Sequence, residues 1–471
     1  MSTRQSVTRK HHPLTSCIAV ALALASPLAF ATTWTVNTCN QGYTGSGTTG
    51  SLRYAAANAV SGDTIDLTNT GCSTISLTTG AVVFAQNSIT LNGPGMTQLT
   101  VTGKYNGAVE KDRIFSHTGT GTFAVNNLSV SKGYSYAATG NAKGGCIYSA
   151  GTAYLNHAGV YFCGAYTKAS GRAQGGGIYG KNAVELKYSI VESNTASGAG
   201  NLGGYGGGVY SHNGFLAKYS TISGNTAGKN TGFGGGALIY GSGLIVSSTI
   251  SGNTAKDNGG GIYAHNFSTS ASNTLTIKNS TVSGNSANYY TGGVAVNAGK
   301  VYLDNSTIAF NTAGKGRFGS YPFTYRAPGV ATDDSNGAMA VTLQSSLIAN
   351  NTYGSTEYDL SVPKRGSTTV TFSGANNLVR TTFAAVPSGT IKISCPLLGP
   401  LKFNGGPTQT HALLSHSPGI DQGNNSLNLT WDQRGSPYAR ASGSAADIGA
   451  YEVQQADVIF NNGFDGCPTL F

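Results

Sequence analysis

The feature of this 471-residue chain that most restricts its fold is a repeated motif with three consecutive glycines. One copy lies within SGNTAKDNGGGIYAHN, residues 251–266, and related copies recur every 25 to 32 residues. The copies are GGCIY at Gly144, GGGIY at Gly175, GGGVY at Gly206, GGGAL at Gly234, GGGIY at Gly259 and TGGVA at Thr291. A period of this length is typical of stacked units that bury a core only against their neighbours.

A phosphate-binding loop is the first alternative for so many glycines. Such a loop needs a lysine directly after the glycines, between a strand and a helix, so that backbone N–H groups and the lysine converge on phosphate. Here Lys256 precedes the glycines, and no helical pattern follows them. The glycines are therefore interpreted as turn residues between short strands.

A second motif, KYSTISGN or a close variant, alternates with the glycine motif. Its copies end at Asn194, Asn225, Asn253, Asn285, Asn311 and Asn351. Apolar residues such as Leu275 and Ile277 alternate as in a strand, and glycine triplets would destabilise helical repeats. The pattern predicts a parallel β-helix of roughly ten to twelve coils. Equivalent residues then lie above one another, so Ile and Val form interior ladders and Asn amides hydrogen-bond from coil to coil.

Composition agrees with short strands and frequent turns. Glycine accounts for 68 of the 471 residues, charged residues for 10 % and hydrophobic residues for 39 %. The charged share is far below the roughly 25 % of ordinary soluble domains. The hydrophobic share is nevertheless high enough for a packed core, which excludes a solvated linker.

The first 31 residues have the pattern of a signal peptide. Arg4, Arg9 and Lys10 form a basic start, residues 14–25 form a short apolar core, and residues 29–31 read Ala-Phe-Ala, a cleavage site. The apolar run is too short to span a bilayer, and no later run is longer. We therefore expect an exported chain without a transmembrane segment, extracellular or on the outer surface of a bacterium. Removing these residues leaves 25 basic against 18 acidic residues, a net charge of +7.

Six cysteines remain after the signal peptide. An even number in an exported chain indicates disulfides, for which 15 connectivities exist. We predict pairing between sequence neighbours: Cys39 with Cys72, Cys146 with Cys163, and Cys395 with Cys467. None of the spacings is typical of a zinc site. Neither a metal nor another cofactor is expected.

On these repeats the chain resembles exported proteins of the pectin-lyase-like superfamily, including polymorphic outer-membrane proteins. Residues 50–58, with Ser51 as a suitable N-cap, look like the short N-terminal capping helix of that superfamily. Residues 405–423, together with DQRG at Asp432 and DIGAYE at Asp447, resemble the C-terminal region of choice-of-anchor Q proteins. The resemblance implies an all-β, right-handed parallel β-helix with a short N-terminal capping helix. It implies a location at or beyond the cell surface, and it implies no particular reaction.

These patterns divide the chain into four parts. Residues 1–31 are the signal peptide, 32–395 the β-helix with its cap, 396–452 the choice-of-anchor Q-like region, and 453–471 a C-terminal tail. Asp432 with Arg434 and Asp447 with Glu452 are expected to form ion pairs and hydrogen bonds that finish the last coil.

The strand after each glycine triplet carries the first candidate site. If Ile178, Val209 and Ile262 point inward, the next residues point outward. Those residues are Tyr179, Tyr210 and Tyr263, and Lys181, His212, Tyr240 and His265 share their face two positions further on. Two interpretations remain open: a platform for successive sugar rings, or an aromatic stack that only stabilises the sheet. A row of Lys187, Lys218 and Lys278 is a weaker signal for an anion.

A long insertion carries the second candidate site. Lys315, Arg317 and Arg326 are interleaved there with aromatic residues such as Tyr325. Cations beside aromatic rings suit a sugar acid, through charge pairing and ring stacking. The alternative is that the aromatic rings cover the side of the β-helix and the cations extend into water.

Acidic residues are scattered, whereas a glycoside hydrolase needs two carboxylates at one site. Asp333 and Asp334 form the one adjacent acidic pair of the mature chain, interpreted as a polar turn rather than a calcium loop. We predict a monomeric, adhesin-like protein that binds an acidic polysaccharide or a cell-surface glycan, with no nucleic-acid partner. The alternative is a polysaccharide lyase or hydrolase acting on an acidic polysaccharide. In a lyase, Lys315, Arg317 or Arg326 would be the base. The sequence does not decide whether the protein is an enzyme.

Overall fold

A computed structural model describes residues 31–104, 112–198, 202–265, 273–297, 299–314, 327–333, 339–361, 370–382, 384–392 and 395–455. The chain divides into two compact units, Met1–Ala31 and Thr32–Phe471, and the second contains the elements reported below. The predicted signal peptide except Ala31, the cations of the insertion at 315–326 and the tail from residue 456 lie outside the described residues.

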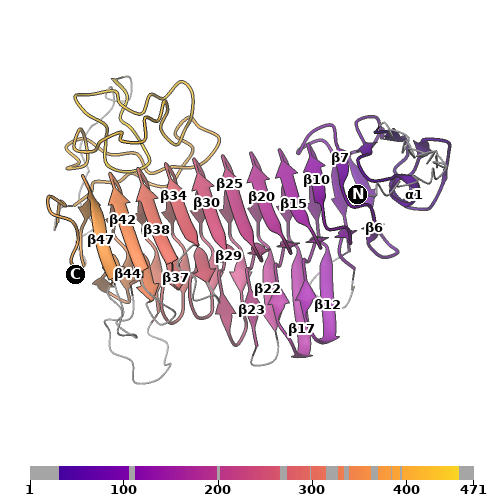
Figure 1. Ribbon diagram of the computed structural model, residues 1–471, viewed down its shortest axis with the longest axis horizontal. Helices are drawn as coiled ribbons and strands as arrows, with labels where there is room; N and C mark the ends of the chain where they lie inside the picture. The colour runs from indigo at the N-terminus through magenta and orange to yellow at the C-terminus, as the bar shows by residue number, and fades with distance from the viewer. Residues whose placement is uncertain are drawn as a thin grey trace, which may run out of the picture. The chain divides into compact units, whose positions relative to one another are not determined.

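The second unit is a parallel β-helix, as predicted (Figure 1). Each coil passes through three long sheets, here named A, B and C, which contain 14, 11 and 10 strands. Sheet A contains, in spatial order, β2 (Gly45–Ser46), β3 (Thr49–Gly50), β1 (Thr33–Val36), β4 (Thr64–Asp66), β7 (Ile89–Asn92), β10 (Thr122–Asn126), β15 (Thr152–Asn156), β20 (Ala183–Lys187), β25 (Gly214–Lys218), β30 (Ser242–Val246), β34 (Thr274–Lys278), β38 (Gly299–Asp304), β42 (Met339–Gln344) and β47 (Val370–Ala375).

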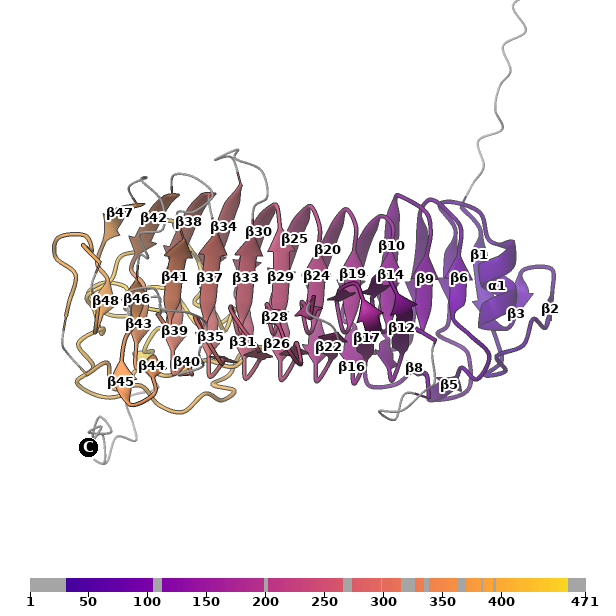
Figure 2. The same ribbon diagram turned by 90° about the horizontal axis from the view of Figure 1, so that it is seen from below.

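Sheets B and C complete the coil, and Figure 2 shows the strands of sheet C side by side. Sheet B contains β5 (Thr74–Ser76), β8 (Thr100–Thr102), β11 (Ser129–Ser131), β16 (Gly159–Tyr161), β21 (Ile190–Glu192), β26 (Thr221–Ser223), β31 (Thr249–Ser251), β35 (Thr281–Ser283), β39 (Thr307–Ala309), β43 (Leu347–Ala349) and β48 (Leu378–Val379). Sheet C contains β6 (Val82–Phe84), β9 (Phe115–His117), β14 (Ile147–Ser149), β19 (Ile178–Gly180), β24 (Val209–Ser211), β29 (Ala237–Tyr240), β33 (Ile262–His265), β37 (Val294–Asn297), β41 (Val330–Asp333) and β46 (Leu360–Ser361).

Two further sheets, D and E, lie between sheets B and C in the chain and extend beyond the three-sheet coil (Figure 1). Sheet D contains β12 (Tyr134–Thr139), β17 (Gly164–Ser170), β22 (Thr195–Gly198), β27 (Thr226–Ala227), β32 (Thr254–Ala255), β36 (Ser286–Ala287), β40 (Thr312–Ala313), β44 (Thr352–Tyr353) and β45 (Thr356–Glu357). Sheet E contains β13 (Ala142–Lys143), β18 (Ala173–Gln174), β23 (Gly204–Tyr205) and β28 (Gly232–Phe233).

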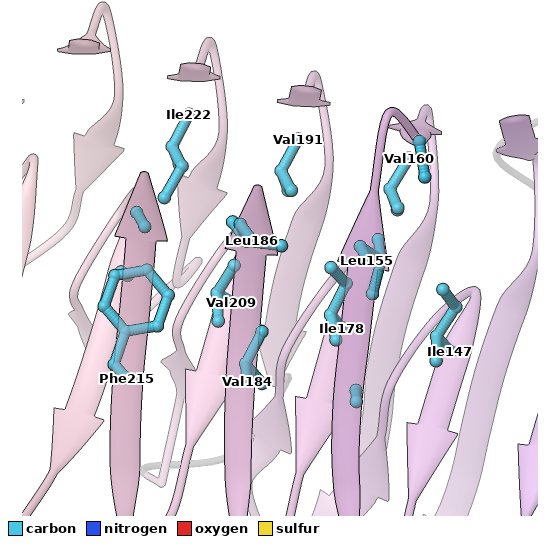
Figure 3. Packing of buried hydrophobic residues seen from close by; sticks show 14 of the residues in the cluster. Ile147, Leu155, Val160, Ile178, Val184, Leu186, Val191, Val209, Phe215 and Ile222 are labelled. Atoms are coloured by element: carbon cyan, nitrogen blue, oxygen red, sulfur yellow. The ribbon is translucent and has the colours of Figure 1, made fainter. Parts of the chain in front are cut away.

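The core fills the inside of the coil with ladders of equivalent apolar residues (Figure 3). Ile147, Ile178 and Val209 pair in register on sheet C, and all three side chains are fully buried. Leu155 and Leu186 do the same on sheet A. Each ladder exists because the same apolar residue type recurs once per coil, at the spacing that the repeat imposes.

One helix, α1 (Leu52–Asn58), lies at the N-terminal end of the stack, at the residues expected to be helical. The Ser51 hydroxyl accepts a hydrogen bond from the Tyr54 N–H at 3.2 Å, which satisfies a backbone donor of the first turn. Leu52, Ala55 and Ala56 are buried in the same core as the sheet ladders. Among the described residues, no helix is both long and apolar enough to cross a membrane.

The asparagines form the predicted ladder through the stack. The side-chain amide of each donates to the side-chain oxygen of the next at 2.8–2.9 Å, from Asn194 through Asn225, Asn253, Asn285 and Asn311 to Asn351. The same oxygens accept the backbone N–H of the preceding asparagine, at 2.9 to 3.0 Å. The amides are fully buried, so this pairing removes the cost of burying them.

The glycine triplets form the turn into sheet C, not a ligand loop. The first glycine, for example Gly206, has φ 69°, a conformation that favours glycine. The third packs against the asparagine ladder. A Cβ on Gly236 would lie 2.6 Å from the Gly261 carbonyl oxygen and 3.0 Å from the Asn253 amide nitrogen. Both positions therefore require glycine, for different reasons.

Disulfides join Cys39 to Cys72 and Cys146 to Cys163, as neighbour pairing predicts. Cys395 is also disulfide-bonded. Its predicted pairing with Cys467 stays a prediction, because Cys467 lies outside the described residues.

Residues 395–455, here called the C-terminal lobe, lie against the outer side of sheet B instead of finishing the last coil (Figure 1). The Ser283 hydroxyl contacts His411 Nε2 at 2.7 Å, and the Thr281 hydroxyl donates to Gln433 Oε1 at 2.6 Å. The expected ion pair of Arg434 with Asp432 is present inside the lobe at 2.7 Å. Glu452 accepts the Asp447 backbone N–H at 2.8 Å, and it pairs with Arg440 at 2.9 Å, which was not predicted. These side chains are buried and hold the lobe together, so the carboxylates are not open to a substrate.

Candidate functional site

The tyrosines of the first candidate site form a row on the outer face of sheet C. Tyr148, Tyr179 and Tyr210 are paired in register on β14, β19 and β24. Their neighbouring ring centroids are 5.5 and 5.1 Å apart, with planes inclined by 13° and 10°. The row belongs to a second apolar cluster, separate from the core inside the coil.

The tyrosine row is covered by sheet E. Tyr205 and Phe233 of sheet E pack against it, and the Phe233 ring lies 5.2 Å from that of Tyr263. Tyr179, Tyr210 and Tyr263 are consequently only 4 %, 3 % and 9 % exposed. Burial, followed by the proximity of Tyr148, raises the pKa of Tyr179 to about 12. The rings of Tyr179 and Tyr210 therefore stack on each other, that of Tyr263 packs against Phe233, and none of the three is an open platform for sugar rings.

Cations surround this row. The Lys143 ammonium lies 5.1 Å from the centre of the Tyr179 ring, and the Arg172 guanidinium lies 4.9 Å from that of Tyr205. Both side chains are half-buried, and Lys181 and His212 are exposed on the same side of sheet C. We call Lys143, Arg172, Lys181 and His212, with the tyrosine row beneath them, the basic face.

The charges of the basic face act on one another. Burial lowers the pKa of Lys143, and the charge of Lys181 lowers it further. The His212 pKa is also lowered, first by burial and then by Lys143 and Lys181. Three cationic or cationisable groups thus lie close enough to repel, an arrangement that favours an anionic ligand.

No carboxylate of the described residues forms an ion pair with Lys143, Arg172 or Lys181. The acidic group beside Tyr205 is Asp257, which is buried and whose Oδ2 accepts the Gly232 N–H at 2.8 Å. Burial raises the pKa of Asp257. A single buried carboxylate of this kind does not supply the acid and base pair of a glycoside hydrolase.

The predicted residues fall into three groups in the structure. Tyr179, Tyr210, Lys181 and His212 are brought together at the basic face. Tyr263 and His265 lie two coils further along, where the His265 ring is 5.4 Å from that of Tyr240. Lys315, Arg317, Tyr325 and Arg326 lie outside the described residues, so their role stays a prediction.

Lys143 and Arg172 were not among the residues predicted from sequence. Both precede a glycine triplet, on or beside the two-residue strands of sheet E. The signal in the sequence was a basic residue one to three positions before Gly144 and Gly175. This basic residue indicates a site only when the structure shows that sheet E covers the tyrosines.

Two other features of the described residues lack the properties of a site. No group of three or more His, Cys, Asp or Glu residues within the described ranges could hold a metal ion. A cavity of about 370 Å³ is lined by Glu357, Arg380, Thr381, Thr382 and Lys392. Its main charges are already paired, because Arg380 and Glu357 form an ion pair at 2.7 Å.

Comparison with known proteins adds little to this geometry. No protein-family model matches the sequence, and no curated protein matches it. The crystal structure of pectate lyase Pel9A is similar at 13 % sequence identity and a TM-score of 0.43, over 90 % of this chain and 97 % of that chain. This likeness is too low to carry any conclusion. The resemblances to polymorphic outer-membrane proteins and to choice-of-anchor Q proteins stay predictions.

Proposed function

We propose that this protein is an exported β-helix protein that binds an acidic polysaccharide through the basic face. The observation that carries the proposal is the convergence of Lys143 and Lys181 at His212, with Arg172 acting on the phenol of Tyr210. Lys143, Arg172 and Lys181 form no ion pair among the described residues. An anionic ligand would remove their mutual repulsion and replace the missing carboxylates. The disulfides are consistent with export, because disulfides persist in oxidising compartments.

The geometry favours a linear polyanion that runs parallel to the stack. Lys143 lies on β13, Lys181 follows β19 of the next coil, and His212 follows β24 of the coil after that. Successive coils are about 4.8 Å apart, so the positive groups recur along the axis at short intervals. Arg172 can bind a carboxylate through two parallel hydrogen bonds, which suits the acid group of a uronic acid.

A polysaccharide lyase is the second candidate function, and Arg172 is the observation that favours it. Its charge acts on the phenol groups of Tyr205, Tyr210 and Tyr240. In a β-elimination, a base removes the proton next to the sugar carboxylate, a carbon–carbon double bond forms, and the bond to the leaving oxygen breaks. That oxygen takes up a proton from the base or from water and leaves as a hydroxyl group. The cations would stabilise the carboxylate as charge develops on it.

One experiment separates the two functions. Residues 32–471 are incubated with polygalacturonate while ultraviolet absorbance of unsaturated ends and retention of the polymer are both followed. Binding without product supports the proposal. Product formation that is lost in Arg172→Ala would replace it with the lyase, and the absence of both binding and product would contradict both functions. Lys300→Gln, an exposed lysine on sheet A, is the matched control.

A further inference from the structure

The corner between sheets A and B carries a row of residues in the left-handed backbone conformation. The row contains Asn127, His157, Tyr188, Tyr219, Ser247, Asn279, Asn305, Ser345 and Asn376, all with φ between 45° and 57°. Asparagine adopts this conformation readily, whereas a bulky residue there is an outlier. Tyr188 at φ 47° and Tyr219 at φ 49° are therefore strained at a position where the other coils of the row use Asn, Ser or His.

The strained tyrosines stack on each other at the surface. Their ring centroids are 4.9 Å apart with planes inclined by 7°, and His157 continues the stack at 4.8 Å from Tyr188. Both tyrosines are half-exposed, and His157 is exposed. Burial, followed by the proximity of Tyr219, raises the pKa of Tyr188.

A pair of lysines adds a second unfavourable feature in the same two coils. Lys187 and Lys218 end strands β20 and β25 and lie directly opposite each other in register, both exposed. Like charges opposite each other in a sheet are unfavourable. Their ammonium groups lie 6.0 and 5.6 Å from the ring centres of Tyr188 and Tyr219. Neither lysine forms an ion pair within the described part of the chain.

The C-terminal lobe accepts hydrogen bonds from asparagines of this row, whereas its contact with Tyr219 is only packing. Asn279 and Asn305 donate their side-chain amides to backbone carbonyls of the lobe, at Trp431 and Asn424, each at 3.1 Å. The lobe reaches Tyr219 at Gly435, where an added Cβ would lie 3.7 Å from the ring. The turn after β25 is seen beside the lobe in Figure 1.

We propose that Lys187, Tyr188, Lys218 and Tyr219, here called the lysine–tyrosine ledge, form a second binding site for a polymer-borne oxyanion. An outlier conformation that the surrounding structure maintains is a reason to infer function. Two lysines in register on strands about 4.8 Å apart can hold one carboxylate or sulfate between their ammonium groups, and the phenol groups beside them are further hydrogen-bond donors. The ledge lies on another side of the coil from sheet C, so one molecule could hold two polymer chains.

The test starts from Lys143→Gln/Arg172→Gln/Lys181→Gln, which removes the cations of the basic face. Any binding that remains in this variant belongs to the ledge, so the two proposed sites are tested separately. Binding to polygalacturonate, dextran sulfate and neutral dextran is measured. We expect residual binding to a charged polymer and none to dextran, with the two charged polymers showing whether carboxylate or sulfate is preferred. Adding Lys187→Gln/Lys218→Gln should weaken this binding about tenfold. Unchanged binding, or no residual binding at all, would overturn the proposal.

A second pair of variants distinguishes binding from simple stacking. Tyr188→Asn/Tyr219→Asn introduces the residue that other coils use at this corner, so the thermal unfolding temperature should not fall, while binding of the charged polymer should weaken. A lower unfolding temperature with unchanged binding would show that the tyrosines only stabilise the coil. Lys300→Gln is again the control for the loss of a surface charge.

Discussion

Asn351 donates both its backbone N–H and its side-chain amide to Oδ1 of Asp359, at 3.0 and 2.8 Å. Asp359 is fully buried and ends the asparagine ladder, and its other oxygen accepts the Thr381 N–H at 2.9 Å. Burial raises the pKa of Asp359 to about 8, although the hydrogen bonds from Asn351 oppose the shift. The carboxyl group of Asp359 therefore takes the place of the next amide at this end of the ladder.

This shift makes stability depend on pH. The ordinary pKa of aspartate is about 3.9, so between pH 4 and pH 8 the folded chain holds a proton that the unfolded chain releases. The stabilisation is therefore complete below about pH 4 and is lost as pH rises toward 8. Asp359→Asn removes this titration and also the acceptor for Thr381. The free-energy gap between wild type and variant, measured by denaturant unfolding, should shrink from pH 5 to pH 8 by at least about 1 kcal/mol. A constant or widening gap would contradict the account.

The third glycine of each triplet should resist substitution because the ladder lies against it. Gly236→Ala places a Cβ against Gly261 and Asn253, and should destabilise the protein by about 2 kcal/mol. Gly214→Ala is the matched control, since its Cβ would meet nothing closer than 3.9 Å. Thermal unfolding of both variants checks this. An equal drop in unfolding temperature in both variants would mean that glycine is needed only for backbone flexibility and not for the close contact with the ladder.

The Cys146–Cys163 disulfide replaces one step of the asparagine ladder. Cys146 lies in register with Gly177, and Cys163 with Asn194, whose side-chain oxygen accepts the Cys163 N–H at 2.9 Å. Cys146→Ser/Cys163→Ser should cost about 3 kcal/mol for a loop of this size. Cys146→Gly/Cys163→Asn should lower the free energy of unfolding by less, because it introduces the residue types of Gly177 and Asn194, which the next coil has at these positions. Similar losses in both double variants would argue against this equivalence.

His212 should make ligand binding depend on pH. Its pKa lies below the ordinary value, because of burial and of Lys143 and Lys181, so it is neutral at pH 7. Lowering the pH through this depressed pKa adds a positive charge to the basic face, and binding of an acidic polysaccharide should become tighter. His212→Gln should remove this increase in an affinity measurement at pH 7 and pH 5. Tightening that persists in the variant would assign the effect to another group.

The repeat made the inside of the coil predictable. Residues one period apart lie above each other, so the ladders of Ile178 with Val209 and of Asn253 with Asn285 follow from the sequence. The alternation of strand residues likewise separated the tyrosines from the core. These features depend on local pattern and on a fixed spacing, both of which can be read from one sequence.

The cations of the basic face were not predictable in the same way. The strands of sheet E contain two residues each and share no apolar pattern, so nothing marked Lys143 as lying over Tyr179 of the next coil. The docking of the C-terminal lobe depends on contacts between distant residues, such as Thr249 with Gln433. Such contacts come from tertiary packing and leave no local signal.

The most direct test of the account is calorimetric titration of polygalacturonate into residues 32–471 at low and high salt. Wild type should bind saturably at low salt and more weakly at high salt, because salt screens the cations of the basic face. Lys143→Gln/Arg172→Gln/Lys181→Gln should bind about tenfold more weakly at low salt, with an unchanged unfolding temperature. Equal affinity in wild type and variant, or no binding by wild type at low salt, would contradict the claim that this face recognises an acidic polysaccharide.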